Sequence, residues 1–268
     1  MNDGRALARV YLEQQRLLGG DAVVLPDAGP APDAGPGPAA AAPDFALLTP
    51  GAGPGNRTTP VAPDLPPPGL SYDPPGGDLF TKDPIPAAES LAAVAELVAG
   101  CTRCRLCEAR RHTVPGEGPA DARLFVVGEG PGRTEDETGR PFVGQAGELL
   151  TKILTAIELP RERVFIGNVV KCRPPENRTP QYDEIAACVP HLFRQIQLVQ
   201  PKVILAMGGT AAQTLLNSKQ SLGAMRGRIH RFRGIPVIVT YHPAALLRNP
   251  NWKKPTWDDV RIARRLLD

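Results

Sequence analysis

The sequence has few aromatic residues and no long hydrophobic run. Aromatic residues make up 5% of the 268 positions, and no stretch approaches the roughly 18 apolar residues that a membrane-spanning helix needs. The segment MNDGRALARVYLEQQ lacks the apolar core of a secretory signal. We therefore expect no membrane contact and a cytoplasmic location, with nucleoid association if the source is bacterial.

Basic residues are almost absent from positions 21–79, where Arg57 stands against seven aspartates. This stretch is rich in proline, glycine and alanine, as in PDAGPAPDAGPGPAAAAPD. Such a composition cannot bury enough apolar area to offset the entropy of ordering the chain. We predict a disordered linker over 21–79, a short amphipathic helix within 1–20, and a folded domain over 80–268.

The predicted domain is basic. Residues 80–268 carry 27 Lys and Arg against 19 Asp and Glu. A basic body suits a polyanionic partner such as nucleic acid. Charge alone leaves open the alternative of an ordinary basic surface without such a partner.

Four β-branched runs alternate with helical stretches in the predicted domain, which indicates an α/β fold with a parallel sheet and helices on both faces. The runs are 124–128, 164–170, 203–208 and 237–241, and the helices are expected at 86–99, 145–157, 181–199, 209–217 and 256–267. Function in such sheets collects at the carboxyl ends of the strands. We expect the functional residues at 128–132, 168–173, 208–210 and 242–248.

Cysteine is absent before position 101, and four of the five cysteines form a set of possible ligands. Cys101 and Cys104 are a C-x2-C pair, and fifteen residues separate Cys172 from Cys188. Thiolates at these spacings suit zinc or an iron–sulfur cluster, and spacing does not choose between them. A structural metal site is favoured over five buried cysteines without metal. Cys107 is interpreted as a spare thiol.

The loop GEGPGRTEDETGRPFVG, residues 128–144, follows the first predicted strand. It departs from the dinucleotide pattern G-x-G-x-x-G because Arg133 replaces the last glycine. Its carboxylates Glu129 and Glu135 would repel phosphate, but they could orient a water molecule. Phe142 is either a core residue or a stacking platform for a nucleobase.

Two further strand ends carry polar groups. The amide of Asn168 could read the edge of a base, or it could simply form a turn. His242 could direct a ring N–H at developing negative charge.

Basic and apolar residues near these strand ends are candidates for DNA contact. Leu246 and Leu247 beside Arg248 form either an apolar wedge next to a phosphate-binding guanidinium or an ordinary amphipathic turn. Arg226 and Arg228, in RGRIHRFRG, could contact phosphates or belong to a solvated basic hairpin.

Taken together, GEGPGRTEDETGRPFVGQAG, NVVKCRPPENRTP, RGRIHRFRGIPVIVTYHPAALLRN and the cysteines make residues 86–268 resemble the family 4, iron–sulfur uracil-DNA glycosylases. The resemblance implies a three-layer α/β/α sandwich around a four-stranded parallel sheet. It also implies a [4Fe–4S] cluster on Cys101, Cys104, Cys172 and Cys188.

The resemblance further implies hydrolysis of the N-glycosidic bond of a flipped-out uracil, which leaves an abasic site. The uracil pocket would comprise Glu129, Gly130, Phe142, Asn168 and His242. Among the catalytic candidates, we expect Glu135 to position water with the Gly130 backbone, Glu129 to shape the pocket, and His242 to lie near the uracil oxygen that gains charge. DNA would be contacted by Arg226, Arg228, Leu246, Leu247 and Arg248.

Such an enzyme is expected to be a monomer and to act on uracil in both single- and double-stranded DNA. It is also expected to be monofunctional, because a lyase needs a lysine that forms a Schiff base, and the nearest candidate, Lys171, is a poor one. Two alternatives stay open. One is a glycosylase for another deaminated base such as hypoxanthine. The other is a non-catalytic, cluster-bearing DNA-binding module, and in either case the helix in 1–20 could recruit a repair or replication partner.

Overall fold

The computed structural model describes residues 65–74 and 83–268. Its centre is a six-stranded sheet with the strand order β1-β5-β6-β4-β2-β3. Four strands, the continuous apolar runs of the sequence, form its parallel part: β2 (Leu124–Gly128), β3 (Val164–Asn168), β4 (Val203–Met207) and β6 (Ile235–Thr240). They are buried on both faces, which is why they lack the alternation of a half-exposed strand.

The sheet is larger than the expected four parallel strands. Strand β5 (Ile229–Phe232) pairs antiparallel with β6, through a tight turn at Arg233 and Gly234, whose φ angles are 49° and 77°. Two successive residues with positive φ are typical of a two-residue hairpin. The basic segment around Arg226 and Arg228 therefore leads into a sheet strand.

Strand β1 (Pro68–Tyr72) pairs parallel with β5. It lies inside the range 21–79, for which the composition predicted a linker, and at these residues that prediction is wrong. The strand is held by a hydrogen bond from Leu70 N to Nδ1 of the buried His230, 2.9 Å long. The predicted helix in 1–20 and the predicted linker up to residue 64 lie outside the described residues.

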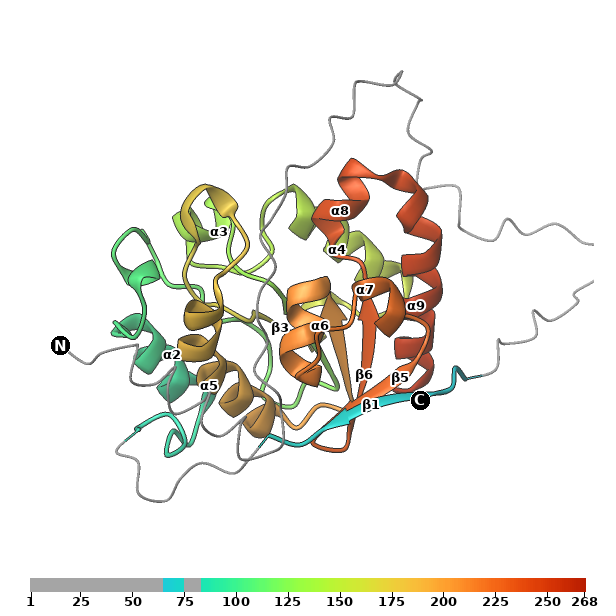
Figure 1. Ribbon diagram of the computed structural model, residues 1–268, viewed down its shortest axis with the longest axis horizontal. Coiled ribbons are helices and arrows are strands. Elements are labelled where there is room, and N and C mark those ends of the chain that lie inside the picture. The colour runs from blue at the N-terminus through green and yellow to red at the C-terminus, as the bar shows by residue number, and fades with distance from the viewer. Residues whose placement is uncertain (1–64, 75–82) are drawn as a thin grey trace, which may run out of the picture. The chain divides into compact units, whose positions relative to one another are not determined.

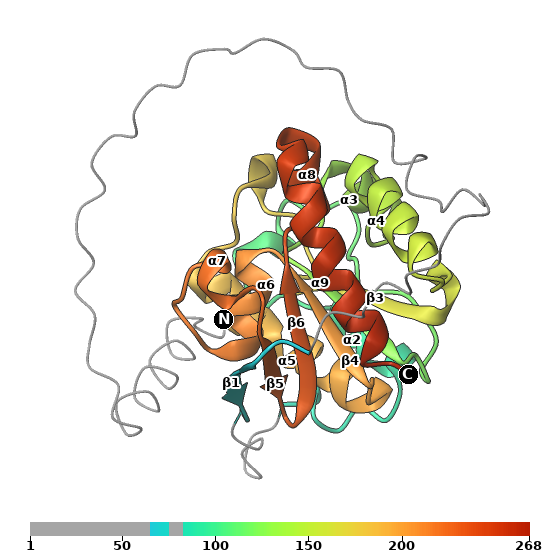
Figure 2. The same cartoon turned by 90° about the vertical axis from the view of Figure 1, so that its right-hand side faces the viewer.

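Helices cover both faces of the sheet (Figures 1 and 2). The longer ones are α2 (Leu91–Ala99), α4 (Gln145–Ala156), α5 (Tyr182–Val199), α6 (Gly209–Leu216) and α9 (Lys253–Arg265). The short ones are α3 (Arg133–Thr138), α7 (Leu222–Met225) and α8 (Pro243–Arg248). Helix α9 packs on β4 and β6, whereas α5 and α6 pack on the opposite face and α2 packs against α5.

Two helices begin at other residues than expected. Helix α2 begins at Leu91 and not near Pro86, because the Ser90 hydroxyl accepts a hydrogen bond from Ala93 N and caps the helix there. Helix α9 begins at Lys253, three residues before its predicted start. None of the described helices is both long and apolar enough to cross a membrane.

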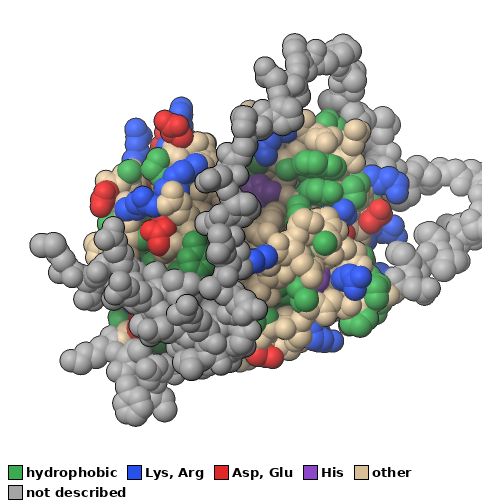
Figure 3. Space-filling view, in the orientation of Figure 1, with side chains coloured by type: hydrophobic (Ala, Val, Ile, Leu, Met, Phe, Trp, Pro, Cys, Tyr) green, Lys and Arg blue, Asp and Glu red, His purple; other side chains and the backbone are tan. Residues whose placement is uncertain are grey.

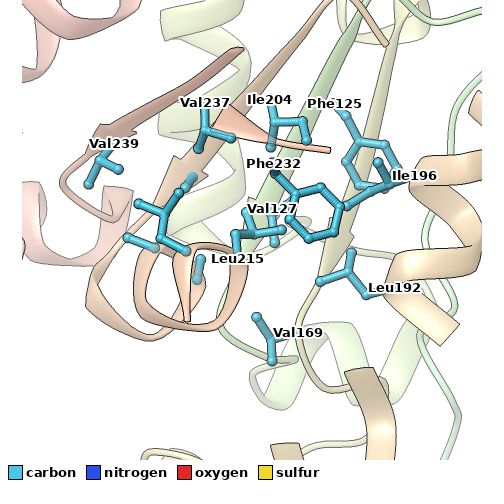
Figure 4. Packing of buried hydrophobic residues seen from close by; sticks show 14 of the residues in the cluster. Phe125, Val127, Val169, Leu192, Ile196, Ile204, Leu215, Phe232, Val237 and Val239 are labelled. Carbon is cyan, nitrogen blue, oxygen red and sulfur yellow. The ribbon is translucent and has the colours of Figure 1, made fainter. Parts of the chain in front are cut away.

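The main hydrophobic core lies between the sheet and helices α5 and α6 (Figure 4). Phe125 and Val127 of β2 meet Ile196 of α5 and Leu215 of α6, and all are almost fully buried. Because the strands are fixed from this side, the residues that follow them are held in defined positions at the edge of the sheet.

Candidate active site and cysteine cavity

The ends of β2 and β3 converge on the ring of Phe142. A side chain at Gly128 would place its Cβ 2.5 Å from Asn168 Oδ1 and 2.5 Å from Phe142 Cζ, so only glycine fits there. Asn168 is 1% exposed, and its Oδ1 atom has no hydrogen-bond partner among the described residues. A buried acceptor left unpaired is costly, so Oδ1 is a candidate acceptor for the N–H group of a ligand.

Phe142 is held from its main chain. Its φ of 51° lies in the left-handed region, which is unfavourable for a bulky residue. Arg161 stabilises this conformation, since Nη1 donates to Phe142 O at 2.9 Å and Nη2 donates to Pro141 O at 2.5 Å. A Cβ at Gly147 would lie 1.8 Å from Phe142 O, so helix α4 also presses on this turn.

His242 approaches Phe142 from the end of β6, with the two ring centroids 5.4 Å apart. Its Nδ1 atom accepts a hydrogen bond from Ala244 N at 3.2 Å and caps α8. Burial lowers the pKa of His242 to about 4, and the positive charge of Arg248 acts in the same direction. The ring is therefore neutral near pH 7 and carries its proton on Nε2.

The two candidate carboxylates, Glu129 and Glu135, differ in the hydrogen bonds that they accept. Glu135 Oε1 accepts from Val143 N and Gly144 N, both at 3.0 Å, and its Oε2 accepts from Gly132 N at 3.1 Å. The carboxylate of Glu129 accepts one hydrogen bond among the described residues, at Oε2 from the Thr210 hydroxyl. These contacts favour Glu129 over Glu135 for orienting water, because the carboxylate of Glu135 is committed to the loop backbone.

The loop that carries Glu129 and Gly130 is attached to the segment after β3. Val169 N donates to Gly128 O, and Val170 N donates to Glu129 O. A Cβ at Gly130 would lie 2.7 Å from Val170 Cγ2, so its backbone lies against that side chain. The start of the loop is thus attached to the segment that follows Asn168.

Two of the five residues predicted to contact DNA are engaged inside the protein. Leu246 is 0% exposed, so the interpretation of a wedge made by both leucines is wrong: Leu247 alone is exposed, at 48%. Arg226 donates to Asp259 Oδ2 at 2.8 Å and to Pro255 O at 2.9 Å. These contacts favour a positioning role for Arg226 over a phosphate contact.

Arg228 and Arg248, the other two arginines predicted to contact DNA, are exposed. Figure 3 shows one face of the molecule, where Lys and Arg side chains lie between hydrophobic groups and a histidine is visible. Such a mixture of cations and apolar groups suits a nucleic-acid backbone with its bases.

All five cysteines line one cavity, together with Arg110, Lys171 and His191. Arg110 Nη1 donates to Cys172 Sγ and Lys171 N donates to Cys188 Sγ, each at 3.2 Å. N–H donors of this kind stabilise thiolates that bind a metal group. Cys107, interpreted as a spare thiol, lies on the same cavity wall.

The described side chains do not form a compact site for a single metal ion. Among the described residues, no three His, Cys, Asp or Glu side chains come close enough to hold one metal ion. A four-iron cluster spreads its cysteines over its corners, so they need not converge on a point. Burial raises the pKa of Cys104 to about 11 and that of Cys188 to about 12, so positive metal charge is needed to keep thiolates here.

The sequence did not predict the contacts by which Arg161 and Lys171 support the site residues. Arg161 occurs in the polar stretch LPRER, which gives no local signal of its contact with Phe142. Lys171 is 1% exposed, and its Nζ donates to Asn168 O at 2.9 Å and to Gln195 Oε1 at 2.7 Å. Burial lowers its pKa to about 8. Its contacts give Lys171 a positioning role for Asn168 and argue against use as a lyase nucleophile.

Comparison with known proteins identifies the family of the chain. Residues 115–262 match the family model of the uracil DNA glycosylase superfamily. The type-4 uracil-DNA glycosylase of Thermotoga maritima is 50% identical over 183 residues, which cover 67% of this chain and 95% of that protein. That of Sulfurisphaera tokodaii is 44% identical over 187 residues, covering 66% and 85%.

More distant relatives match a smaller part of the chain or of their own length. The type-5 uracil-DNA glycosylase of Pyrobaculum aerophilum is 31% identical over 150 residues, which cover 50% of this chain and 66% of that protein. A DNA polymerase of Bacillus phage SP01 is 28% identical over 154 residues, which are 17% of its length. From the family model and the type-4 relatives, the chain belongs to the uracil-DNA glycosylase superfamily, in its type-4 family.

Proposed function

We propose that this protein is a monofunctional uracil-DNA glycosylase, which hydrolyses the bond between N1 of uracil and C1′ of the sugar and leaves an abasic site. The observation that carries the proposal is the unpaired, buried Oδ1 atom of Asn168, which lies beside Gly128 together with the ring of Phe142. A base in a duplex cannot reach such a site, so the nucleotide must first be flipped out.

Recognition follows from the amide of Asn168. A uracil stacked on Phe142 would donate its N3–H to Oδ1 and accept from Nδ2 at O4. In the same amide orientation, cytosine would leave both amide atoms without a partner, because it has no N3–H and carries an amino group at C4. A site built to hydrogen-bond one base strongly rejects an analogue that cannot pair with it.

The neutral ring of His242 would stabilise the negative charge that develops on uracil during cleavage. As the C1′–N1 bond breaks, its electron pair moves onto uracil and O2 becomes negative. The Nε2–H of His242 donates to this oxygen without giving up its proton, because burial disfavours a charged ring. The oxygen of a water molecule bonds to C1′, and the proton that this water loses ends on the released uracil anion.

We assign the orientation of this water to Glu129 and the shaping of the loop to Glu135. Glu129 has a free carboxylate oxygen among the described residues and lies next to the backbone of Gly130. Its negative charge would also stabilise the sugar as that becomes cation-like. Glu135 keeps the turn around Val143 and Gly144 in place through three accepted N–H bonds.

We assign Cys101, Cys104, Cys172 and Cys188 to a [4Fe–4S] cluster. When bound, the cluster supplies a cross-link that ties the start of the domain to the segment after β3 and to α5. The donors on Cys172 and Cys188 support this assignment. Iron and sulfide in the purified protein would agree with it, whereas bound zinc would contradict it.

For DNA binding we propose Arg228, Leu247 and Arg248. The exposed Leu247 would fill the space that the flipped base leaves, and the two arginines would contact phosphates. The enzyme would act as a monomer on both single- and double-stranded DNA. The segment 1–20 remains a proposed site for a repair or replication partner.

The test is base release from oligonucleotides that contain a single uracil, hypoxanthine or xanthine. We expect release of uracil alone, with the strand broken only after alkali treatment. Preferred release of hypoxanthine would support a different glycosylase. Binding of the uracil strand without any release would support a non-catalytic DNA-binding module, and strand breakage without alkali would support a lyase.

A further inference from the structure

His191 is a buried imidazole to which neither the proposed reaction nor the four cysteine ligands assign a role. It lies on α5, three residues after Cys188, and is 1% exposed. Neither Nδ1 nor Nε2 has a hydrogen-bond partner among the described residues. Two unpaired polar atoms on one buried ring are unusual, so a group that fills the adjacent space must satisfy at least one of them.

The adjacent space is the cysteine cavity. His191 lines it with Cys101 and Cys188, and it also lines a second pocket of about 230 Å³ that includes Thr102. Burial and the nearby charges of Lys171 and Arg103 keep the pKa of His191 low, at about 4. The ring is therefore neutral, with one N–H donor to place.

The charged side chains that act on the pKa of His191 are already used. Asp83 accepts two hydrogen bonds from the guanidinium of Arg103 and one from Ile85 N. Lys171 Nζ is directed to Asn168 and Gln195. Sulfur atoms are therefore the acceptors left for His191 on the cavity side.

We propose that His191 donates an N–H hydrogen bond to a sulfur atom of the iron–sulfur cluster, as a third donor beside Arg110 and the main chain of Lys171. The inference rests on the cluster assigned above. Hydrogen bonds to cluster sulfur stabilise the reduced form, which carries one more negative charge, and so raise the reduction potential. His191 would act as a positioning and tuning residue and would not be an iron ligand.

The first experiment compares reduction potentials of the full-length holoprotein by voltammetry. His191→Leu removes the donor, and we expect a shift to a more negative potential. His191→Gln keeps an N–H donor, and we expect a potential closer to that of the unchanged protein. Leu192→Met, a fully buried apolar position on the same helix, is the packing control and should leave the potential unchanged. Equal potentials in all four proteins would overturn the proposal.

The second experiment does not depend on whether His191→Leu folds. The unsubstituted protein is produced with ¹⁵N-labelled histidine, and pulsed electron paramagnetic resonance spectra of its reduced cluster are recorded. We expect a ¹⁵N hyperfine coupling that disappears in labelled His191→Gln, which assigns it among the four histidines of the chain. A weak coupling fits a hydrogen bond, and its absence, or the strong coupling of a directly bound nitrogen, would overturn the proposal.

Iron content and uracil release separate this inference from the proposed function. A brown protein that releases uracil but shows neither the coupling nor the shift would refute the hydrogen bond alone. A protein that releases uracil without any iron would refute the cluster and the role of His191 together, and would leave the glycosylase activity standing.

Discussion

Arg161 and Phe142 are joined by a hydrogen bond of 2.9 Å from guanidinium Nη1 to a main-chain carbonyl oxygen. The same guanidinium is paired with Glu117 at 2.7 Å, and only 14% of the Arg161 side chain is exposed. The guanidinium of Arg161, which is not proposed to contact the base, thus fixes the orientation of the Phe142 ring on which the base would stack. Because Phe142 has an unfavourable backbone conformation, it depends on this support.

Arg161→Gln should slow uracil release by about 10-fold or more, because a small misplacement of the ring costs rate. Single-turnover release with DNA in saturating amounts measures the effect, and binding of DNA should change little. The control is Arg140→Gln, which removes the other arginine that is hydrogen-bonded to Glu117. Equal rates in both variants would contradict the role of Arg161.

Glu129→Gln and Glu135→Gln should separate catalysis from structure. Glu129→Gln should lower the single-turnover rate by about 10- to 100-fold and leave the melting temperature unchanged, since it alters a group with one hydrogen bond. Glu135→Gln weakens three bonds from main-chain N–H groups and should cost about 2 kcal/mol of stability. An unchanged rate in Glu129→Gln would remove it from the mechanism.

The pH dependence of release should show no inflection near pH 6.5. Burial holds the pKa of His242 at about 4 in the folded protein, so the neutral donor persists as the pH falls from 8 to 5. Since the folded pKa lies below the unfolded value, the stability contributed by the neutral ring is lost as pH falls from about 6.5 through 4. Histidine NMR titration measures the pKa directly, and a value near 6.5 would contradict this account.

Asn168→Ala should reduce uracil release on the order of 100-fold, comparable with the loss of one pre-organised hydrogen-bonding group. It removes both the acceptor and the donor proposed for the base edge, in a position where the Asn168 side chain is almost fully buried. The melting temperature should not fall, because Oδ1 has no partner to lose among the described residues. Retention of full activity would contradict base recognition by this amide.

Leu247→Ala and Leu246→Ala form a matched pair of adjacent positions. Leu247 is 48% exposed, so its truncation should slow release from double-stranded DNA and leave release from single strands nearly unchanged. Leu246 is fully buried, so its truncation should cost about 2–5 kcal/mol of stability instead. Equal effects of Leu247→Ala on both substrates would contradict a wedge.

Local sequence was informative where a residue's role depends on its own neighbours. The β-branched runs gave the strands β2, β3, β4 and β6 within a few residues, because a strand buried on both faces must be continuously apolar. The polar residues that follow these runs marked the strand ends. Asn168 and His242 could be singled out for this reason, whereas Phe142 was singled out by its position in the loop that follows the first of these strands.

Contacts between segments that are distant along the chain could not be predicted from the sequence. Strand β1 contains a proline and a glycine, and its composition predicted a linker. It forms because β5 has an unpaired edge and because His230 accepts a hydrogen bond from the β1 backbone. The exposures of Leu246 and Leu247 differ because α8 turns only one of them toward the core. The commitment of Glu135 to main-chain N–H groups likewise depends on how the loop folds back.

The sequence by itself determined the α/β class, the order of the motifs and the chemistry available at each strand end, since periodicity and residue type are local properties. Only the tertiary structure decided which of those groups are free to act. Whether a carboxylate, a guanidinium or an imidazole has a partner depends on segments that meet in space, as Glu135, Arg226 and His191 illustrate.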